Sequence, residues 1–168
     1  KDGSGNRVTG YLGRIRFSSN DPATTIVLPG DYTFTAGDGG IHTFPSGVTL
    51  RTAGERSVTA IDIAGDGLGV DGVTGTQINI TVNAGGASNF TVSGISDPVS
   101  AGAASSVTVE IKDASGNRVT VYLGRIRFTS NDTAATVVLP GDYTFTAGDS
   151  GIHTFTNGVT LRTAGERT

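Results

Sequence analysis

The sequence predicts an all-β fold, a sandwich of two packed sheets present in tandem copies. Apolar and polar residues alternate at period two through most of the chain, which is the pattern of half-buried strands. The composition, with 26 Gly among 168 residues and abundant Thr, Ser and Val, suits short strands and tight turns and disfavours helices. In addition, residues 1–57 recur as residues 112–168, which sets a period of 111 residues.

The two copies of the repeated segment are nearly identical in sequence. Ten of the 57 aligned positions differ, which leaves 47 identical, and the changes are mild, such as Ile26 to Val137. Because 168 is 111 plus 57, we interpret the chain as a window from a longer array. We expect a partial repeat over residues 1–83 without its opening strands, a linker over residues 84–88, and a repeat over residues 89–168 without its closing strand.

Strand and turn signals follow one another along the second repeat. Residues 118–130 read as one long strand or as two strands separated by a bulge at Gly124. We expect turns at residues 113–117, 148–150 and Asn157-Gly158, the last a dipeptide typical of tight hairpins. The other expected strands span residues 89–96, 106–112, 136–139, 142–147, 151–155 and 159–163, with 56–63 and 77–82 in the first copy. Seven or eight short strands without a helix signal indicate a two-sheet sandwich.

Three strings carry a resemblance to a known family. They are NFTVSGISDPVSAGAASSVTVEIKDASGNRV at residues 89–119, LPGDYTFTAGDSGIHTF at 139–155 and TLRTAGERSVTAID at 49–62. Together they resemble the bacterial immunoglobulin-like repeats of large surface and secreted proteins, similar in character to invasin- and intimin-type stalk modules. The likeness covers essentially the whole chain, least of all residues 64–76. It implies an immunoglobulin-like β-sandwich and a role as stalk, spacer or adhesive array.

Charge and composition exclude several classes of partner. The formal net charge is −3 and only two lysines occur, so we expect no nucleic-acid partner. No apolar run approaches the ~20 residues that cross a bilayer, so we expect no membrane insertion. The absence of Cys excludes disulfides and thiolate metal sites, and the additional absence of Met leaves no readily oxidised sulfur. This surface chemistry favours an extracellular or cell-surface location.

Two sets of residues are candidate sites. Asp62, Asp66 and Asp71 lie in DIAGDGLGVDG, where carboxylates and Gly-rich backbone offer the hard oxygens that calcium prefers. Their spacing matches no EF-hand loop, and Asp-Gly pairs are also common in plain turns. Asn79, Asn89 and Asn131 each begin an Asn-x-Ser/Thr sequon and are candidate glycosylation sites if the source organism modifies secreted proteins.

Other polar side chains have both a structural and a functional interpretation. Lys112 and Glu110 share a strand face, which allows an isopeptide bond from the lysine but favours a solvent-facing pair. His42 and His153 occupy identical places, and one His per repeat does not make a metal site, so we expect an outward or packed strand residue. We expect the arginines of the two GRIRF strings, at 14, 16, 125 and 127, to pair with carboxylates of an adjoining repeat.

No paired acid, nucleophile or cofactor motif occurs at useful spacing, so we expect no enzymatic activity. The leading hypothesis is an extracellular structural repeat that forms a stalk, filament or adhesin shaft. Its partners are then neighbouring copies of the same repeat, in the same chain or in a homo-polymer, with strand pairing between units as one route of assembly. The alternative is a carbohydrate- or protein-binding module of a secreted multidomain protein that binds a glycan or cell-surface ligand, with Tyr32 and Asp38 as candidate contacts.

Overall fold

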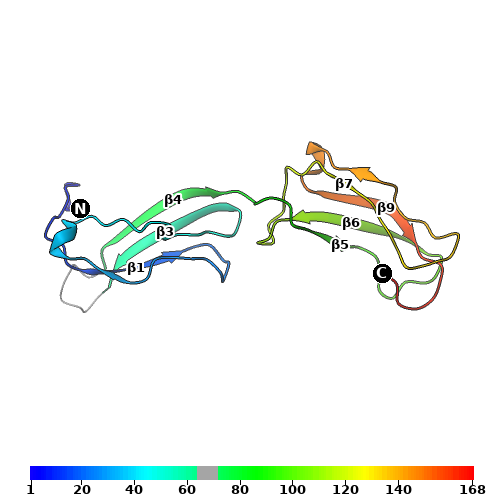
Figure 1. The fold of residues 1–168 in the computed structure, drawn as a ribbon, viewed down its shortest axis with the longest axis horizontal. Coiled ribbons are helices and arrows are strands. Elements are labelled where there is room, and N and C mark those ends of the chain that lie inside the picture. Colours follow the sequence, from blue (N-terminus) through cyan, green and yellow to red (C-terminus); the bar gives the residue numbers. More distant parts are fainter. Residues whose placement is uncertain (64–71) are drawn as a thin grey trace. The chain divides into compact units, whose positions relative to one another are not determined.

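The computed structural model describes residues 1–63 and 72–168, and within them the fold is all-β (Figure 1). No helix in this part of the chain is long and apolar enough to cross a membrane. The first half contains β1 (Arg14–Ser19), β2 (Tyr32–Thr33), the 3₁₀ helix η1 (Ala36–Asp38), β3 (Gly54–Asp62) and β4 (Thr74–Val82). The second half contains β5 (Asn89–Ser93), β6 (Ala104–Lys112), β7 (Arg125–Ile126), β8 (Tyr143–Thr144), the 3₁₀ helix η2 (Ala147–Asp149) and β9 (Ile152–Thr160).

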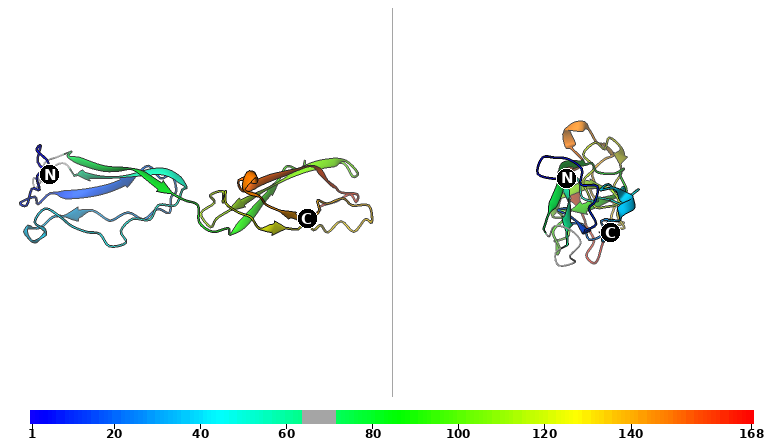
Figure 2. Two further views of the ribbon diagram at one scale, coloured as in Figure 1. Left: turned by 90° about the horizontal axis from the view of Figure 1, so that it is seen from above. Right: turned by 90° about the vertical axis from the view of Figure 1, so that its left-hand side faces the viewer.

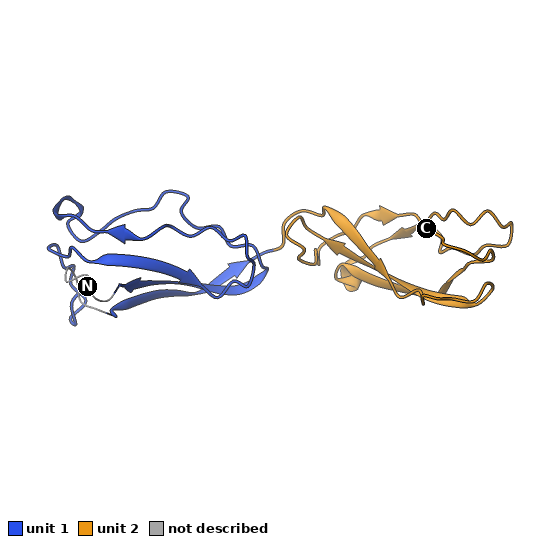
Figure 3. Cartoon of the chain, turned by 90° about the horizontal axis from the view of Figure 1, so that it is seen from below, with its two compact units in different colours: residues 1–83 blue, residues 84–168 orange. Residues whose placement is uncertain are grey.

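The chain divides into two compact units, unit 1 (Lys1–Asn83) and unit 2 (Ala84–Thr168) (Figure 3). The segment 84–88, which we expected to be a linker, belongs to unit 2. Ala84 packs against the core of that unit, and the backbone N–H of Ser88 donates to the carbonyl of Lys112 over 2.8 Å.

The described residues of unit 1 form one antiparallel sheet in the order β2-β1-β3-β4 (Figure 2). The register of β1 on β3 runs from Ile15 opposite Asp62 to Ser19 opposite Val58. The long β3–β4 pair continues the sheet and contains a bulge between Arg56 and Val58. Strand β3 is therefore the element that joins the repeated segment to the residues that follow it.

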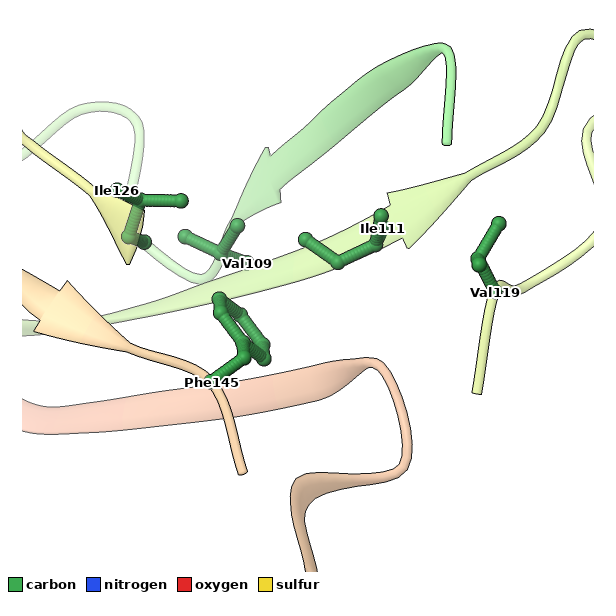
Figure 4. Close-up of a cluster of buried hydrophobic side chains, with 5 residues drawn as sticks. All are labelled: Val109, Ile111, Val119, Ile126 and Phe145. Atoms are coloured by element: carbon green, nitrogen blue, oxygen red, sulfur yellow. The ribbon is translucent and has the colours of Figure 1, made fainter. Parts of the chain in front are cut away.

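Unit 2 has two sheets, β5-β6-β9 and β7-β8. Burial alternates along β6, with Val107, Val109 and Ile111 all at most 2% exposed, as expected for a strand with one face on a core. Figure 4 shows that the core cluster joins residues of both sheets and the coil between them. Its members are Val109 and Ile111 of β6, Val119, Ile126 of β7, and Phe145 after β8.

Several expected strands differ from the structure. Residues 136–139 form only the isolated bridge of Val138 with Thr160, and the strand expected over 142–147 covers only Tyr143–Thr144.

Two further differences have a physical cause. Asn157-Gly158 is not a hairpin turn, because β9 continues through it, and Asn157 takes a φ of 52° at an irregularity opposite Ser105–Val107. The expected strand over 118–130 is reduced to the two residues of β7. In unit 1 the equivalent β1 has six residues because β3 pairs with it, whereas the described chain supplies no such partner in unit 2.

Another strand, β9, is present in unit 2, and the equivalent strand is absent from the described residues of unit 1. Residues 41–49 differ from residues 152–160 only at positions 45 and 46, yet they form a single bridge, from Val27 to Thr49, and no strand. In unit 2 the same stretch pairs with β6 along most of its length. Strand formation here is thus decided by the available partner and not by local sequence preference.

The equivalent residues Val48 and Val159 test this dependence directly. Val159 is 3% exposed and Val48 is 44% exposed. We expect Val159→Ala to destabilise unit 2 by about 2 kcal/mol, since a buried side chain is truncated, and Val48→Ala to change unit 1 by less than about 0.5 kcal/mol. Urea unfolding followed by residue-resolved NMR reports each unit separately. Equal losses in the two units would contradict our account of the core.

Candidate functional site

The most elaborate polar cluster is centred on one aspartate in each copy, Asp38 in unit 1 and Asp149 in unit 2. In unit 2 the carboxylate of Asp149 accepts hydrogen bonds from the backbone N–H of Thr146 at 2.7 Å and from its hydroxyl at 2.8 Å. The hydroxyl of Tyr143 donates at 2.9 Å, and Nδ1 of His153 lies 2.7 Å away. Unit 1 repeats every one of these contacts.

The same cluster fixes the ionisation of its members. The backbone N–H of Thr146 is the main cause that holds the pKa of Asp149 well below its usual range. Burial, followed by the adjacent carboxylate, raises the pKa of Tyr143. His153 stacks on the ring of Tyr143 with centroids 4.1 Å apart, so it is a packed strand residue, one of the two roles expected for it. The cluster fastens η2 to strands β8 and β9.

A second aspartate also occupies the same place in both copies. Asp132 is 5% exposed, and its carboxylate accepts from the backbone N–H groups of Arg162 at 2.6 Å and Thr163 at 3.1 Å, and from the hydroxyl of Thr163 at 2.8 Å. Asp21 makes the equivalent bonds to Arg51 and Thr52. The backbone N–H of Arg162 is the largest of the contributions that lower the pKa of Asp132. Each aspartate therefore joins two segments about 30 residues apart.

A third aspartate differs between the copies. Asp113 accepts from the backbone N–H groups of Ser115 and Asn117 and, through Oδ2, from Gly85 N–H at 2.8 Å. Burial opposes its ionisation, but the hydrogen bonds from Asn117, Gly85 and Ser115 outweigh that effect and lower its pKa to about 2. Its counterpart Asp2 closes the same turn with Ser4 and Asn6 but is exposed.

Of these aspartates, only Asp38 was a candidate from the sequence, and it was expected to contact a glycan and not to hold its own loop. The capping-box spacing Thr-x-x-Asp, at Thr35–Asp38 and Thr146–Asp149, is the signal that would have identified the first of them. Asp113 also accepts from nearby Ser115 and Asn117, within the turn that the sequence predicted over residues 113–117. Its contact with Gly85, and the contacts of Asp132 with Arg162 and Thr163, are with groups distant in sequence, and no local pattern reveals such partners. All three aspartates have a structural role, because their hydrogen bonds link loops to strands of the same unit. We call them the aspartate fasteners.

The calcium hypothesis concerns one described residue. Asp62 is 3% exposed, its Oδ2 accepts from the hydroxyl of Tyr11, and its Oδ1 has no partner among the described residues. Asp66 and Asp71 lie outside the described residues. In the part of the chain that the structure describes, no three His, Cys, Asp or Glu side chains gather in a metal-binding group.

The sequon residues all lie on exposed positions. Asn79 is in β4, where its φ is 59°, and Asn89 begins β5. The side chain of Asn131 accepts a hydrogen bond from the backbone N–H of Thr168 at 3.0 Å. Each is sterically open to a glycan, and glycosylation at these positions stays a prediction.

The charged strand residues pair within their own unit. Arg125 and Arg127 both contact Asp142, at 2.5 and 2.7 Å, and Arg16 contacts Asp31 at 2.7 Å. For Arg16, Arg125 and Arg127, the expected pairing with an adjoining repeat is thus replaced by pairing to the segment that carries β2 or β8. Ion pairs this exposed contribute little to stability. The carboxylate of Glu110 lies 3.2 Å from Nζ of Lys112 and 2.7 Å from Nε of Arg118.

The two units also differ in an apolar groove on unit 1. It has a volume of about 670 Å³ and is lined by Phe17, Val48, Leu50, Val58, Ala60 and Ile80, among others. All fully buried apolar side chains among the described residues belong to unit 2. A smaller groove of about 220 Å³ lies in unit 2, between residues of β5, β6 and β7 and adjoining coil. A contiguous apolar surface that is exposed to solvent usually indicates an interaction site.

No protein-family model, no curated protein and no solved structure matches the chain.

The contrast between Asp113 and Asp2 gives a test of the aspartate fasteners. We expect Asp113→Asn to destabilise unit 2 by about 1 to 2 kcal/mol at pH 7, because the replaced oxygen no longer accepts from Gly85. Asp2→Asn, at an exposed turn without that contact, serves as the matched control and should cost less than about 0.5 kcal/mol.

The pH dependence of the same variant follows from the pKa of about 2. A carboxyl whose folded-state pKa is depressed stabilises the fold above its unfolded pKa of about 3.9, and this contribution is lost as the pH falls toward 2. The difference in unfolding free energy between wild type and Asp113→Asn should therefore shrink between pH 4 and pH 2. A difference that is constant over this interval would exclude the ionised carboxylate as its cause.

Proposed function

We propose that the chain belongs to an extracellular structural protein in which immunoglobulin-like β-sandwich repeats form a stalk, filament or adhesin shaft. The role is mechanical and not catalytic. The observation that carries the proposal is that two nearly identical segments, residues 2–53 and 113–164, pair with different hairpins in the two units, and we interpret the units as complementary parts of one 111-residue repeat. Unit 2 supplies the opening hairpin, β5 and β6, and unit 1 supplies the closing hairpin, β3 and β4. Each hairpin joins its own copy of a middle segment, which spans residues 2–53 in unit 1 and 113–164 in unit 2.

Joining these parts in sequence order gives a complete domain. One sheet would be β5-β6-β9, taken from unit 2, and the other would be β2-β1-β3-β4, taken from unit 1. In the immunoglobulin nomenclature these are an A-B-E sheet and a C′-C-F-G sheet, which is the strand distribution of that fold. Seven strands in two antiparallel sheets support the sandwich, with β6 and β3 as the central strands that hold the middle segment.

The polar features favour structure over ligand binding. Tyr32 and Asp38, the residues expected to contact a glycan in the alternative function, bond to each other and to their own loop. A surface of few charges, no Cys and no Met supports an exposed and durable extracellular protein. Neighbouring copies of the same repeat are the partners that this proposal requires.

Proteins that contain two, four and six complete 111-residue repeats test the proposal by small-angle scattering. We expect the maximum dimension to increase by a constant amount with each repeat, as in a linear array whose repeats contact only their neighbours. A compact assembly would instead grow with roughly the 0.38 power of chain length. That weaker dependence would overturn the mechanical role. Binding of single repeats to a glycan array, abolished by Tyr32→Ala, would favour the alternative.

A further inference from the structure

The groove of unit 1 is lined in part by Val48, whose equivalent in unit 2, Val159, lies opposite Ser105 of the opening hairpin, β5 and β6. Equivalent residues of the two units show what the hairpin covers: Val8 is 41% exposed, but Val119 is 5% exposed. Val48 of unit 1 is likewise more exposed than its equivalent Val159 of unit 2. Because the repeated segments are nearly identical in sequence, the missing hairpin explains the difference, and not a change in the side chains.

Backbone hydrogen bonds also show which part of unit 1 the hairpin would cover. In unit 2 the N–H of Val119 donates to the carbonyl of Ile111, and the N–H of Ile111 donates to the carbonyl of Gly151, both at 2.9 Å. Strand β6 also pairs with β9, from Ala104 opposite Thr160 to Glu110 opposite Ile152. The equivalent edge of unit 1, residues 41–49, forms no strand. It presents the kind of unpaired edge that accepts a strand by β-augmentation.

Neither of the two substitutions in the edge of unit 1 prevents this pairing. Ser46 has a φ of 51°, which matches the 52° of Asn157 at the irregularity of β9. Pro45 lacks a backbone N–H, but its equivalent Thr156 lies within that irregularity and has no register partner on β6. The two substitutions in the edge therefore leave strand pairing intact.

A count of the elements limits where the hairpin comes from. The described chain has two middle segments but one opening hairpin, and that hairpin already forms the core of unit 2. A second identical chain could donate its hairpin only by opening its own unit 2, where Val107, Val109 and Ile111 would be exposed. The donor is thus a hairpin beyond those that the two described units contain.

We propose that unit 1 is the acceptor for the opening hairpin of a further repeat of the same kind, with a sequence like that of Asn89–Lys112. The hairpin would dock with its β6 strand along residues 41–49, and the side chains equivalent to Val107, Val109 and Ile111 would fill the groove. This inference rests on the proposed function and names the contact that links one repeat to the segment completing it.

A synthetic peptide of residues 84–112 serves as the probe, titrated into the isotope-labelled 168-residue chain. We expect saturable binding of one peptide per chain, with amide exchange at residues 41–49 slowed by at least about tenfold as the strand forms. The control peptide carries Val107→Asp and Val109→Asp and should not bind, since it would bury charge in an apolar groove.

Two variants of the chain place the contact. Val48→Asp should weaken peptide binding by at least about tenfold, and it should leave unit 1 folded because Val48 is exposed in the free chain. Val27→Asp is the matched control with no expected effect, because its equivalent Val138 remains 45% exposed in unit 2 with the hairpin in place. An equal effect of both variants would overturn the proposed site.

The remaining outcomes also decide the question. Absence of binding, or binding that exchanges the hairpin of unit 2 and leaves residues 41–49 unprotected, would overturn the acceptor role. Neither outcome bears on the scattering experiment, because multi-repeat proteins there supply their hairpins within one chain. A failed titration with linear growth of the array thus rejects only this inference, whereas compact multi-repeat proteins reject the proposed function.

Discussion

The pairing of β6 with β9 is the interaction on which the core depends. It brings Val107, Val109 and Ile111 against side chains from β7 and from the coil after β8, and it turns residues 152–160 into a strand. Without it, nearly the same sequence in unit 1 leaves Val8 and Val48 more than two-fifths exposed. Burial of apolar area is the main favourable contribution to folding, so the free energy of each unit depends on a hairpin from outside the middle segment.

The clusters around two of the aspartates in each copy do not depend on the hairpins. The bonds around Asp38 and Asp149 agree closely in the two units, even though unit 2 has fully buried apolar side chains and unit 1 has none among its described residues. Asp21 and Asp132 agree equally well. Each cluster needs only groups of the middle segment itself, so its geometry is independent of either hairpin. The middle segment thus keeps its loops ordered by local hydrogen bonds and obtains its core from elsewhere.

This division explains what the sequence could predict. The all-β class follows from period-two alternation, and β5 and β6 were located because their pattern is local. The length of β7 and the missing strand at residues 41–49 could not be predicted, because both depend on a partner that is distant in sequence. The prediction of a turn at Asn157-Gly158 was wrong for the same reason. The positive φ of Asn157 is compatible with a hairpin turn or a bulge, and because β9 pairs with β6 the residue lies in a bulge. For the candidate site, the sequon positions could be predicted from the sequence. The aspartate clusters and the groove could be identified only once the fold was known.

The same constraint bears on how such an array would respond to force. If each repeat is completed by its own opening and closing hairpins, then the middle segment is held between β6 on one sheet and β3 on the other. Removal of either hairpin exposes apolar surface but leaves the aspartate-fastened loops in place. A repeat that loses a hairpin would therefore lose the edge strand but keep its loops, and Ser46 in residues 41–49 keeps the positive φ found at the equivalent Asn157. Rebinding then requires only the edge strand to form on the hairpin, because the loops of the middle segment are already ordered, and this lowers the entropic cost of closing the domain again.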